Sequence, residues 1–467
     1  MAGADASLYP VKTPDGEAHD VGTATTRHTT LGLERRTWLM LAIILAGAAL
    51  RLFRLGEQSV WFDEAARLVM ASSDLSSFLR NAAQDTQPPF FHLTQHFWLK
   101  VGTNAFLGRF LPAAMGILLL PLVYRLAREL FDQKTALIAA ALAALMPYQV
   151  YQAQQANLYA MVALLSGLQI WFFWKAVHDK HWRHWLAFGF CTILGLYTHY
   201  YSVFIFVTLH LFLLIYRARY PGRWPRLLLI DGAVALAFLP LVGRLIKGTN
   251  EVFTGFWLTR PSPLAPLTTL YFFVTSYSLP KWGIVLAMFV TLAALAIGLY
   301  ELVLGVRSDR QKAEPLLFVF LLSFVPILMV FMISQIKPIF LARALIVVIP
   351  AFIVLLGRAL SVSRLRSPLP YLYLSMGGLM VLSLAHYYFN PAFAKPPFRE
   401  ASTYISDNFQ VGDVVLHTTT SSFMPFLFYD PPPDHYLLKG DPAPHHPPEV
   451  FRLGGGKDVT ADEIVGY

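Results

Sequence analysis

Two adjacent carboxylates, Asp63 and Glu64, follow two aromatic residues in the motif Trp61-Phe62-Asp63-Glu64. Charged groups among aromatic residues at a membrane surface carry a desolvation cost, and they are usually kept for a task such as acid–base catalysis. A local explanation is equally good: Asp63 caps the start of a helix, and Glu64 is favoured there by the helix dipole. The motif therefore indicates either a catalytic acid or base, or a helix N-terminus.

A second acidic residue, Asp85, precedes the pair Pro88-Pro89 in the same segment. Two prolines fix the backbone and end the segment before them, so they can direct Asp85 toward a site shared with Asp63. A plain turn before an aromatic helix explains the same residues. His92 and His96 are four residues apart on that predicted helix and would make a metal site with Asp85 if the three converge, but such pairs also arise by chance.

Polar residues also gather at two other places between apolar segments. Amide and tyrosine side chains fill the turn from Gln149 to Tyr159, a composition that suits sugar hydroxyls and equally suits a wet loop. His199 and Tyr200 end another apolar segment. An aromatic belt at the membrane surface explains the tyrosine, and the histidine either binds a phosphate or reaches for water.

The composition identifies the elements that must position these residues. Of 467 residues, 56% are apolar and 14% are charged, against about 45–50% and about 25% in soluble domains. With a mean hydropathy of +0.50, the chain has too little polar surface for several soluble domains. The single cysteine, Cys191, excludes an intramolecular disulfide. The sequence therefore predicts an all-α polytopic membrane protein.

About eleven apolar segments approach the roughly 20 residues that a helix needs to cross a bilayer. They are residues 37–55, 107–127, 135–150, 158–177, 184–199, 201–216, 227–246, 283–304, 315–335, 341–360 and 369–389. The net charge of +9 is spread over short basic clusters between these segments. These clusters do not form a continuous basic face, so we expect no nucleic-acid partner.

The basic clusters fall in alternate connections, as the positive-inside bias predicts. We therefore expect a flexible cytoplasmic tail at residues 1–36, a transmembrane domain at residues 37–389, and an extracytoplasmic C-terminus. The outer face carries a long first loop at residues 56–106, a second loop at residues 247–282, and a soluble tail at residues 390–467. Within that tail, residues 412–416 predict a turn into a strand, and we expect a small α/β-like segment there.

Two cations, Lys337 and Arg343, fall on this sparsely basic outer face. Because they run against the charge bias, an anionic partner such as a lipid phosphate is a natural explanation. Anchoring to lipid headgroups is the alternative.

Taken in order, these motifs resemble a known group. They are Trp61–Glu64, the pattern Asp-x-x-Pro-Pro that begins at Asp85, Gly102 to Arg109, the Gln- and Tyr-rich turn, Thr-His-Tyr at residues 198–200, and Pro-x-x-x-x-Arg ending at Arg343. The set is similar to bacterial membrane glycosyltransferases related to the protein O-mannosyltransferases and the lipid A aminoarabinose transferases. The resemblance covers roughly residues 37–360.

The resemblance implies the type C glycosyltransferase fold, with interfacial helices and an active site at the outer surface of the bacterial inner membrane. It implies a polyprenyl-phosphate monosaccharide as donor and a glycan, lipid or protein as acceptor. Asp63 matches the catalytic base of such enzymes, Glu64 its acidic neighbour, Asp85 the second loop acid, and Arg343 an arginine on the donor side.

Two positions depart from the family's pattern. Where the family often has Gln-Glu-x-Arg-x-Tyr, this chain reads Gln154-Gln155-Ala156-Asn157-Leu158-Tyr159, without either charge. The His or Lys that often precedes the proline pair is Gln87 here. Arg67, Lys337 and His199 are the candidates to supply the missing cation.

The resulting hypothesis is a single displacement with inversion, in which Asp63 is the base and cations hold the phosphate of the leaving group. The substrate-binding residues that we expect are Glu64, Arg67, Tyr159, His199, Tyr200, Lys337 and Arg343. We expect no required cofactor; a divalent metal is kept as an alternative that the sequence does not indicate. The alternative is a non-catalytic membrane subunit or a transporter that retains the fold. Mid-membrane charges are scarce here, which argues against a transporter.

Overall fold

The computed structural model describes residues 21–85, 87–179, 181–255, 258–361, 369–429, 435–438 and 457–459. The chain divides into two compact units, Met1–Ala42 and Ile43–Tyr467. In the first, the described residues belong to helix α1, and the second contains all the other elements. The sequence predicted a flexible tail to residue 36, but α1 (Val21–Leu52) begins earlier, at Val21.

The second unit is almost entirely helical. Its helices are α2 (Phe62–Ser72), α3 (Leu75–Gln84), α4 (Phe90–Trp98), α5 (Ala105–Leu130), α6 (Gln133–Leu145), α7 (Pro147–Ala153), α8 (Tyr159–His178), α9 (Trp182–Thr198), α10 (Ser202–Ile215), α11 (Trp224–Gly255), α12 (Ala265–Thr275), α13 (Lys281–Ser308), α14 (Arg310–Ile336), α15 (Ile349–Ser361), α16 (Leu369–Phe389), α17 (Phe398–Asn408) and α18 (Thr420–Phe428). Short 3-10 helices are η1 (Pro221–Arg223), η2 (Ala344–Val348) and η3 (Pro391–Phe393). The strands are β1 (Val415–His417), β2 (His435–Leu438) and β3 (Lys457–Val459).

Seven helical segments of the described chain are long and apolar enough to cross a membrane, or eight if the bent pair α6 and α7 counts as one span. These eight correspond to eight of the predicted spans. The other three predictions fall on α1, α9 and α10; α9 has 17 residues and α10 has 14. At about 1.5 Å per residue, both are shorter than the roughly 30 Å of a bilayer core. The chain is a multi-pass membrane protein.

Polar caps and prolines determine where several helices begin. The side chain of Asn104 accepts a hydrogen bond from Leu107 N at the start of α5, and that of Asp132 accepts one from Thr135 N at the start of α6. Pro147 occupies the first turn of α7, and the chain bends by 56° between α6 and α7. Proline fits this position because it needs no hydrogen-bond partner for its nitrogen.

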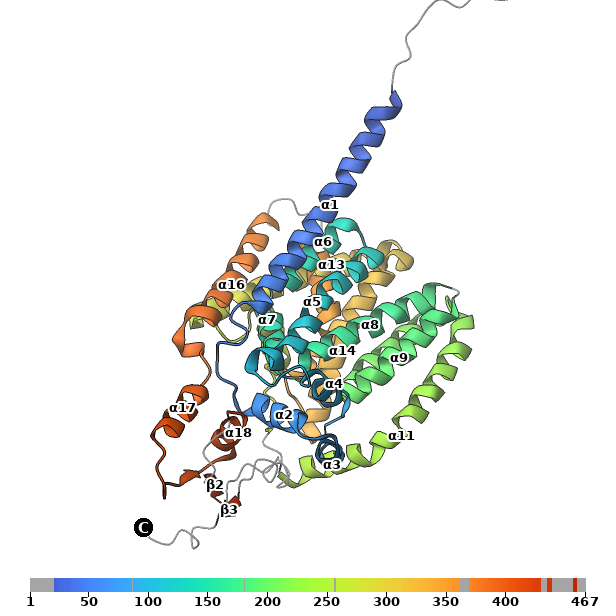
Figure 1. The fold of residues 1–467 in the computed structure, drawn as a ribbon. Coiled ribbons are helices and arrows are strands. Elements are labelled where there is room, and N and C mark those ends of the chain that lie inside the picture. Colours follow the sequence, from blue (N-terminus) through green and yellow to red (C-terminus); the bar gives the residue numbers. More distant parts are fainter. Residues whose placement is uncertain are drawn as a thin grey trace, which may run out of the picture. The chain divides into compact units, whose positions relative to one another are not determined.

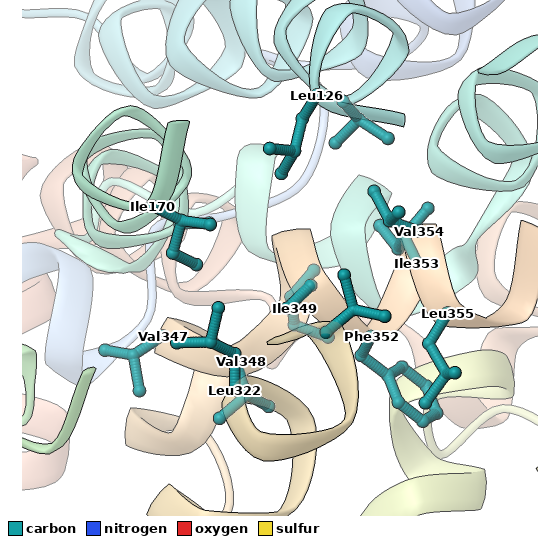
Figure 2. Packing of buried hydrophobic residues seen from close by; sticks show 14 of the residues in the cluster. Leu126, Ile170, Leu322, Val347, Val348, Ile349, Phe352, Ile353, Val354 and Leu355 are labelled. Atoms are coloured by element: carbon teal, nitrogen blue, oxygen red, sulfur yellow. The ribbon is translucent and has the colours of Figure 1, made fainter. Parts of the chain in front are cut away.

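The core is built around one buried segment, η2 followed by α15, in which nearly every residue is buried. Figure 2 shows its apolar side chains, including Val348 and Phe352, packed among residues from neighbouring helices such as Leu126 and Ile170. Around it lie α5, α6, α8, α13 and α14. Gly357 allows α15 to approach α6 closely, because a Cβ there would lie 2.8 Å from the Cβ of Ala139 in α6. This segment matters for the site because Arg343 immediately precedes it.

The first loop folds into three short helices, α2, α3 and α4. The sequence predicted the aromatic helix after Pro88-Pro89, and α4 confirms it. Helix α2 begins at Phe62, so Trp61 and not Asp63 occupies its N-cap. The explanation of Asp63 as a cap was therefore wrong, and both carboxylates lie in the first turn of the helix.

The C-terminal segment packs on this loop. Helix α18 lies against α2, as Figure 1 shows, and a small apolar cluster that includes Leu68, Phe423 and Met424 joins them. Gly412 has a φ of +100° and lies three residues before the first residue of β1, which confirms the predicted turn into a strand. Strands β1, β2 and β3 form a parallel sheet in that order. The proline-rich stretch at residues 431–433 lies outside the described residues.

Candidate active site

Glu64 lies at the centre of a buried ion cluster with no solvent exposure. The guanidinium of Arg109 in α5 binds both carboxylate oxygens, with Nε 2.8 Å from Oε1 and Nη2 2.8 Å from Oε2. Lys395 Nζ donates to Oε2 at 2.7 Å, and Ala156 N donates to Oε1 at 2.8 Å. This geometry favours a structural role for Glu64 over the direct substrate contact that the sequence suggested.

The cluster changes the acidity of its members. Burial alone would raise the pKa of Glu64, but Arg109 and Lys395 outweigh it and lower that pKa to about 2. Burial and the nearby Arg109 lower the pKa of Lys395, and the carboxylate of Glu64 opposes that change. Glu64 is therefore a permanent carboxylate at neutral pH, and its charge favours the protonated form of Lys395.

Two arginines hold the segment at residues 55–60, which leads to Asp63. Arg109 donates to the carbonyls of Leu55, Gln58 and Ser59, which with its bonds to Glu64 uses all of its N–H groups. Arg399 in α17 donates to the carbonyls of Gly56 and Glu57. The hydroxyl of Ser59 donates to the carboxylate of Glu400, and Val60 N donates to the hydroxyl of Tyr429. Residues 55–60 are thus fixed from α5 on one side and from the C-terminal segment on the other.

Asp63 faces away from this cluster and meets the residue that precedes the buried core segment. Its Oδ2 lies 2.7 Å from Nη1 of Arg343. The side chain of Asp63 is 18% exposed and that of Arg343 is 32% exposed, so a substrate can reach both. The Arg343 guanidinium lies 5.7 Å from the centre of the Tyr159 ring. Of the predicted site residues, Asp63, Tyr159 and Arg343 are therefore brought together.

Arg67 and His199 extend the same group. Arg67 Nη1 donates to the backbone carbonyl of Asp63 at 2.7 Å, one turn earlier in α2. The buried ring of His199 accepts from Tyr201 N through Nδ1, at 3.1 Å. Burial and the nearby guanidinium groups of Arg343 and Arg67 all oppose a positive charge on that ring. Arg343 and Arg67, not His199, therefore provide the positive charge at this site.

Asp85 lies beside His92 of α4. Its Oδ2 is 3.8 Å from Nε2 of His92, and its Oδ1 accepts from Gln87 N. Burial lowers the pKa of His92 to about 4 even though Asp85 opposes that change, so the ring is neutral at pH 7. Arg67 is close enough to His92 to contribute to this shift. Arg67 thus links the surroundings of Asp63 and Asp85.

The metal site considered for Asp85, His92 and His96 does not form, because His96 has other partners. His96 shares α4 with His92, but its Nδ1 lies 2.8 Å from the carbonyl of Ala71 and its ring stacks on Phe78. In the part of the chain that the structure describes, no three metal-ligating side chains come together.

Tyr200 and Lys337 are the two remaining predicted site residues. Tyr200 is close enough to Arg244 and Asp85 to interact electrostatically with both. Lys337 Nζ donates to the carbonyl of Thr249 in α11, at 2.8 Å.

Sequence reasoning missed the roles of Arg244, Lys395 and Arg399. Arg244 in α11 donates through Nη1 to the carbonyls of Ala82, Asp85 and Gln87, and so holds the turn that carries Asp85. A signal was available for Lys395 and Arg399, because both lie on the predicted outer face, where basic residues are scarce. Arg244 falls within the predicted span 227–246, so the same signal did not mark it.

Comparison with known proteins agrees with this architecture. The family described as dolichyl-phosphate-mannose-protein mannosyltransferase matches residues 86–243. ArnT from Cupriavidus metallidurans matches with a TM-score of 0.57 and 15% identity, over 88% of this chain and 87% of that one. The same protein bound to undecaprenyl phosphate gives 0.57 and 16%, over 89% and 87%. The chain has the fold of the polytopic membrane glycosyltransferases.

A third structure shares this fold. The archaeal oligosaccharyltransferase AglB from Archaeoglobus fulgidus, in complex with an inhibitory peptide and a dolichol-phosphate, has a TM-score of 0.54 and 14% identity, over 80% of this chain and 58% of that one. No curated protein matches the sequence. The predicted fold class and the resemblance to membrane glycosyltransferases are confirmed.

Proposed function

We propose that this protein transfers a monosaccharide from a polyprenyl-phosphate donor to an acceptor hydroxyl at the outer face of the bacterial inner membrane, with inversion at the anomeric carbon. The observation that carries the proposal is the contact between Asp63 and Arg343. In this contact a partly exposed carboxylate lies beside a partly exposed guanidinium, and the proposed reaction needs one group of each kind, as base and as phosphate-binding cation. Structures of this fold that bind undecaprenyl phosphate and dolichol-phosphate support the donor class.

In the proposed reaction the acceptor oxygen attacks the anomeric carbon while its proton passes to Asp63. The bond between that carbon and the phosphate oxygen breaks, and the polyprenyl phosphate leaves with both bonding electrons. Arg343 and Arg67 stabilise the charge on the leaving phosphate, so no strong general acid is required. One displacement with one base inverts the configuration, unlike the two-carboxylate hydrolases that retain it.

The ion pair of Asp63 with Arg343 also suggests an order of binding. While Arg343 donates to Oδ2, that oxygen is occupied and is not available to an acceptor hydroxyl. A donor phosphate would compete for the guanidinium. Donor binding therefore releases Asp63 for the acceptor proton, which limits acid–base chemistry in the absence of donor.

The test measures release of polyprenyl phosphate from labelled donors by purified protein in lipid. Asp63→Asn should lower the rate by about 10²–10⁴-fold, the usual effect of losing a general base. Asp74→Asn is the matched control, because Asp74 lies in the same loop and caps α3, where asparagine serves equally well. The assignment of the base fails if Asp63→Asn keeps the wild-type rate. If the wild type binds donors but releases phosphate from none, the protein is a non-catalytic member of the fold.

A further inference from the structure

A cavity of about 290 Å³ lies beside the proposed active site and has no assigned ligand. Its aromatic walls come from four different parts of the chain: Trp61, Tyr151, Tyr277, and Tyr387 with Phe393. The rings of Tyr151 and Tyr277 pack edge to face with their centres 5.0 Å apart, and those of Tyr151 and Tyr387 do so with centres 5.8 Å apart. These rings form an aromatic cage.

The cage adjoins the catalytic group. Trp61 immediately precedes α2, whose second residue is Asp63. Tyr151 lies close enough to Asp63 and Arg343 to interact electrostatically with both. A molecule in the cage is therefore a neighbour of the proposed base. Its walls carry tyrosine hydroxyls and a lysine, which suit a polar ligand better than a polyprenyl chain.

The cage also carries an uncompensated positive charge. Glu64 is one carboxylate shared by two cations, Arg109 and Lys395. All N–H groups of Arg109 donate to protein atoms, whereas Lys395 donates one hydrogen bond, to Glu64, among the described residues. Because Lys395 lines the cavity, the excess charge faces the ligand. Gln58 lines it too, and its buried Oε1 accepts no hydrogen bond in the described chain.

These features select one ligand class. Aromatic cages often bind quaternary ammonium groups, but the ammonium of Lys395 repels a cation. Flat rings pack against the C–H faces of a sugar, and the tyrosine hydroxyls and Gln58 suit its hydroxyl groups. We infer that the cage binds the acceptor, and that this acceptor is a carbohydrate with an acidic group, a carboxylate or a phosphate. Calling this ligand the acceptor rests on the proposed function, but its binding to the cage can be measured without any sugar transfer.

The experiment is ligand binding by saturation-transfer NMR, on the full chain in lipid nanodiscs without any donor. The probes are methyl glucoside, methyl glucuronide, glucose 6-phosphate, choline and a serine- and threonine-containing peptide. Either or both acidic sugars should bind about tenfold more tightly than methyl glucoside, which is the effect of one charge-assisted hydrogen bond. The glucuronide and phosphate arms distinguish the two acidic groups.

Three variants separate the contributions. Lys395→Met should abolish the preference for the acidic sugar, and Lys395→Arg should restore it. Tyr277→Ala should weaken all three sugars, because Tyr277 is a wall of the cage that is 40% exposed and is not one of the groups that bind the Glu64 carboxylate. Tyr404→Ala is the control, since Tyr404 is an exposed tyrosine on α17.

Equal binding of neutral and acidic sugars by the wild type would overturn the inference. So would no saturable sugar binding, preferential binding of choline or peptide, or an unaffected Tyr277→Ala variant. Acidic sugars that bind to a protein without lipid-phosphate release would refute the proposed transfer and keep the cage. Release without sugar binding would do the reverse.

Discussion

Replacement of Glu64 by glutamine tests how the active-site loop is held. Glu64 accepts four hydrogen bonds of 2.7–2.8 Å, two from Arg109, one from Lys395 and one from Ala156 N. Glutamine has one oxygen, so its amide NH₂ must face Arg109 or Lys395. The change leaves two buried cations without a carboxylate.

The expected cost follows from that loss. Breaking a buried ion pair by removing one partner costs about 3–5 kcal/mol, which shifts the unfolding equilibrium by roughly two to four orders of magnitude. Lys395→Met alone should cost much less, because the two-point contact between Glu64 and Arg109 remains. In the double variant Glu64→Gln/Lys395→Met, only Arg109 is left as a buried cation without a carboxylate partner. We therefore expect it to lose about 0.5–3 kcal/mol less than the sum of the single variants.

Unfolding in mixed micelles with increasing denaturing detergent gives the three free energies on one scale. Glu57→Gln is the matched control, because Glu57 lies in the same loop with an exposed side chain. Should Glu64→Gln change the free energy of unfolding by less than about 0.5 kcal/mol, within the range of ordinary surface substitutions, the buried cluster does not hold the loop. Strict additivity of the two single variants would contradict the coupling between Glu64 and Lys395.

Three further outcomes follow from the same structure. Because the pKa of Glu64 falls from 4.5 to about 2 in the folded protein, its stabilisation is present above pH 4.5 and is lost as the pH falls toward 2; acid unfolding of wild type and Glu64→Gln should show this difference. Arg244→Met should lower kcat for lipid-phosphate release without changing donor KM, since the hydrogen bonds of Arg244 hold the Asp85 turn; an altered donor KM alone would contradict this. Because the proposed reaction takes the counter-charge for the phosphate from Arg343 and Arg67, EDTA should leave the release rate unchanged, and a loss that Mg²⁺ or Mn²⁺ reverses would disprove it.

The packing of the core allows a separate test. Gly357→Val introduces a Cβ 2.8 Å from the Cβ of Ala139 and should destabilise the protein by about 1–3 kcal/mol through overpacking. Gly377→Val is its control, because no atom lies within 4 Å of a Cβ at that position. Thermal unfolding followed by fluorescence compares the two, and equal melting temperatures would refute the close approach of α15 and α6.

Composition and local pattern were enough to predict several features of the fold. Long apolar segments have few alternatives to a helix, because every backbone polar group in a bilayer needs a partner within the chain. The turn at Gly412 and the aromatic helix after Pro88-Pro89 follow from local backbone preferences. Local pattern was weaker where length decides, since α9 and α10 are apolar but short.

The different roles of Asp63 and Glu64 could not be read from local pattern. Consecutive residues of a helix point about 100° apart, so both side chains cannot face the same surroundings. Which carboxylate is buried depends on partners distant in sequence: Arg109 is 45 residues from Glu64, Lys395 is 331 residues away, and Arg343 is 280 residues from Asp63. Only the packed helices bring those cations to α2. The sequence determined that two acids lie in the first turn of this helix, and the tertiary structure decided that one is a buried anchor and the other is partly exposed beside Arg343.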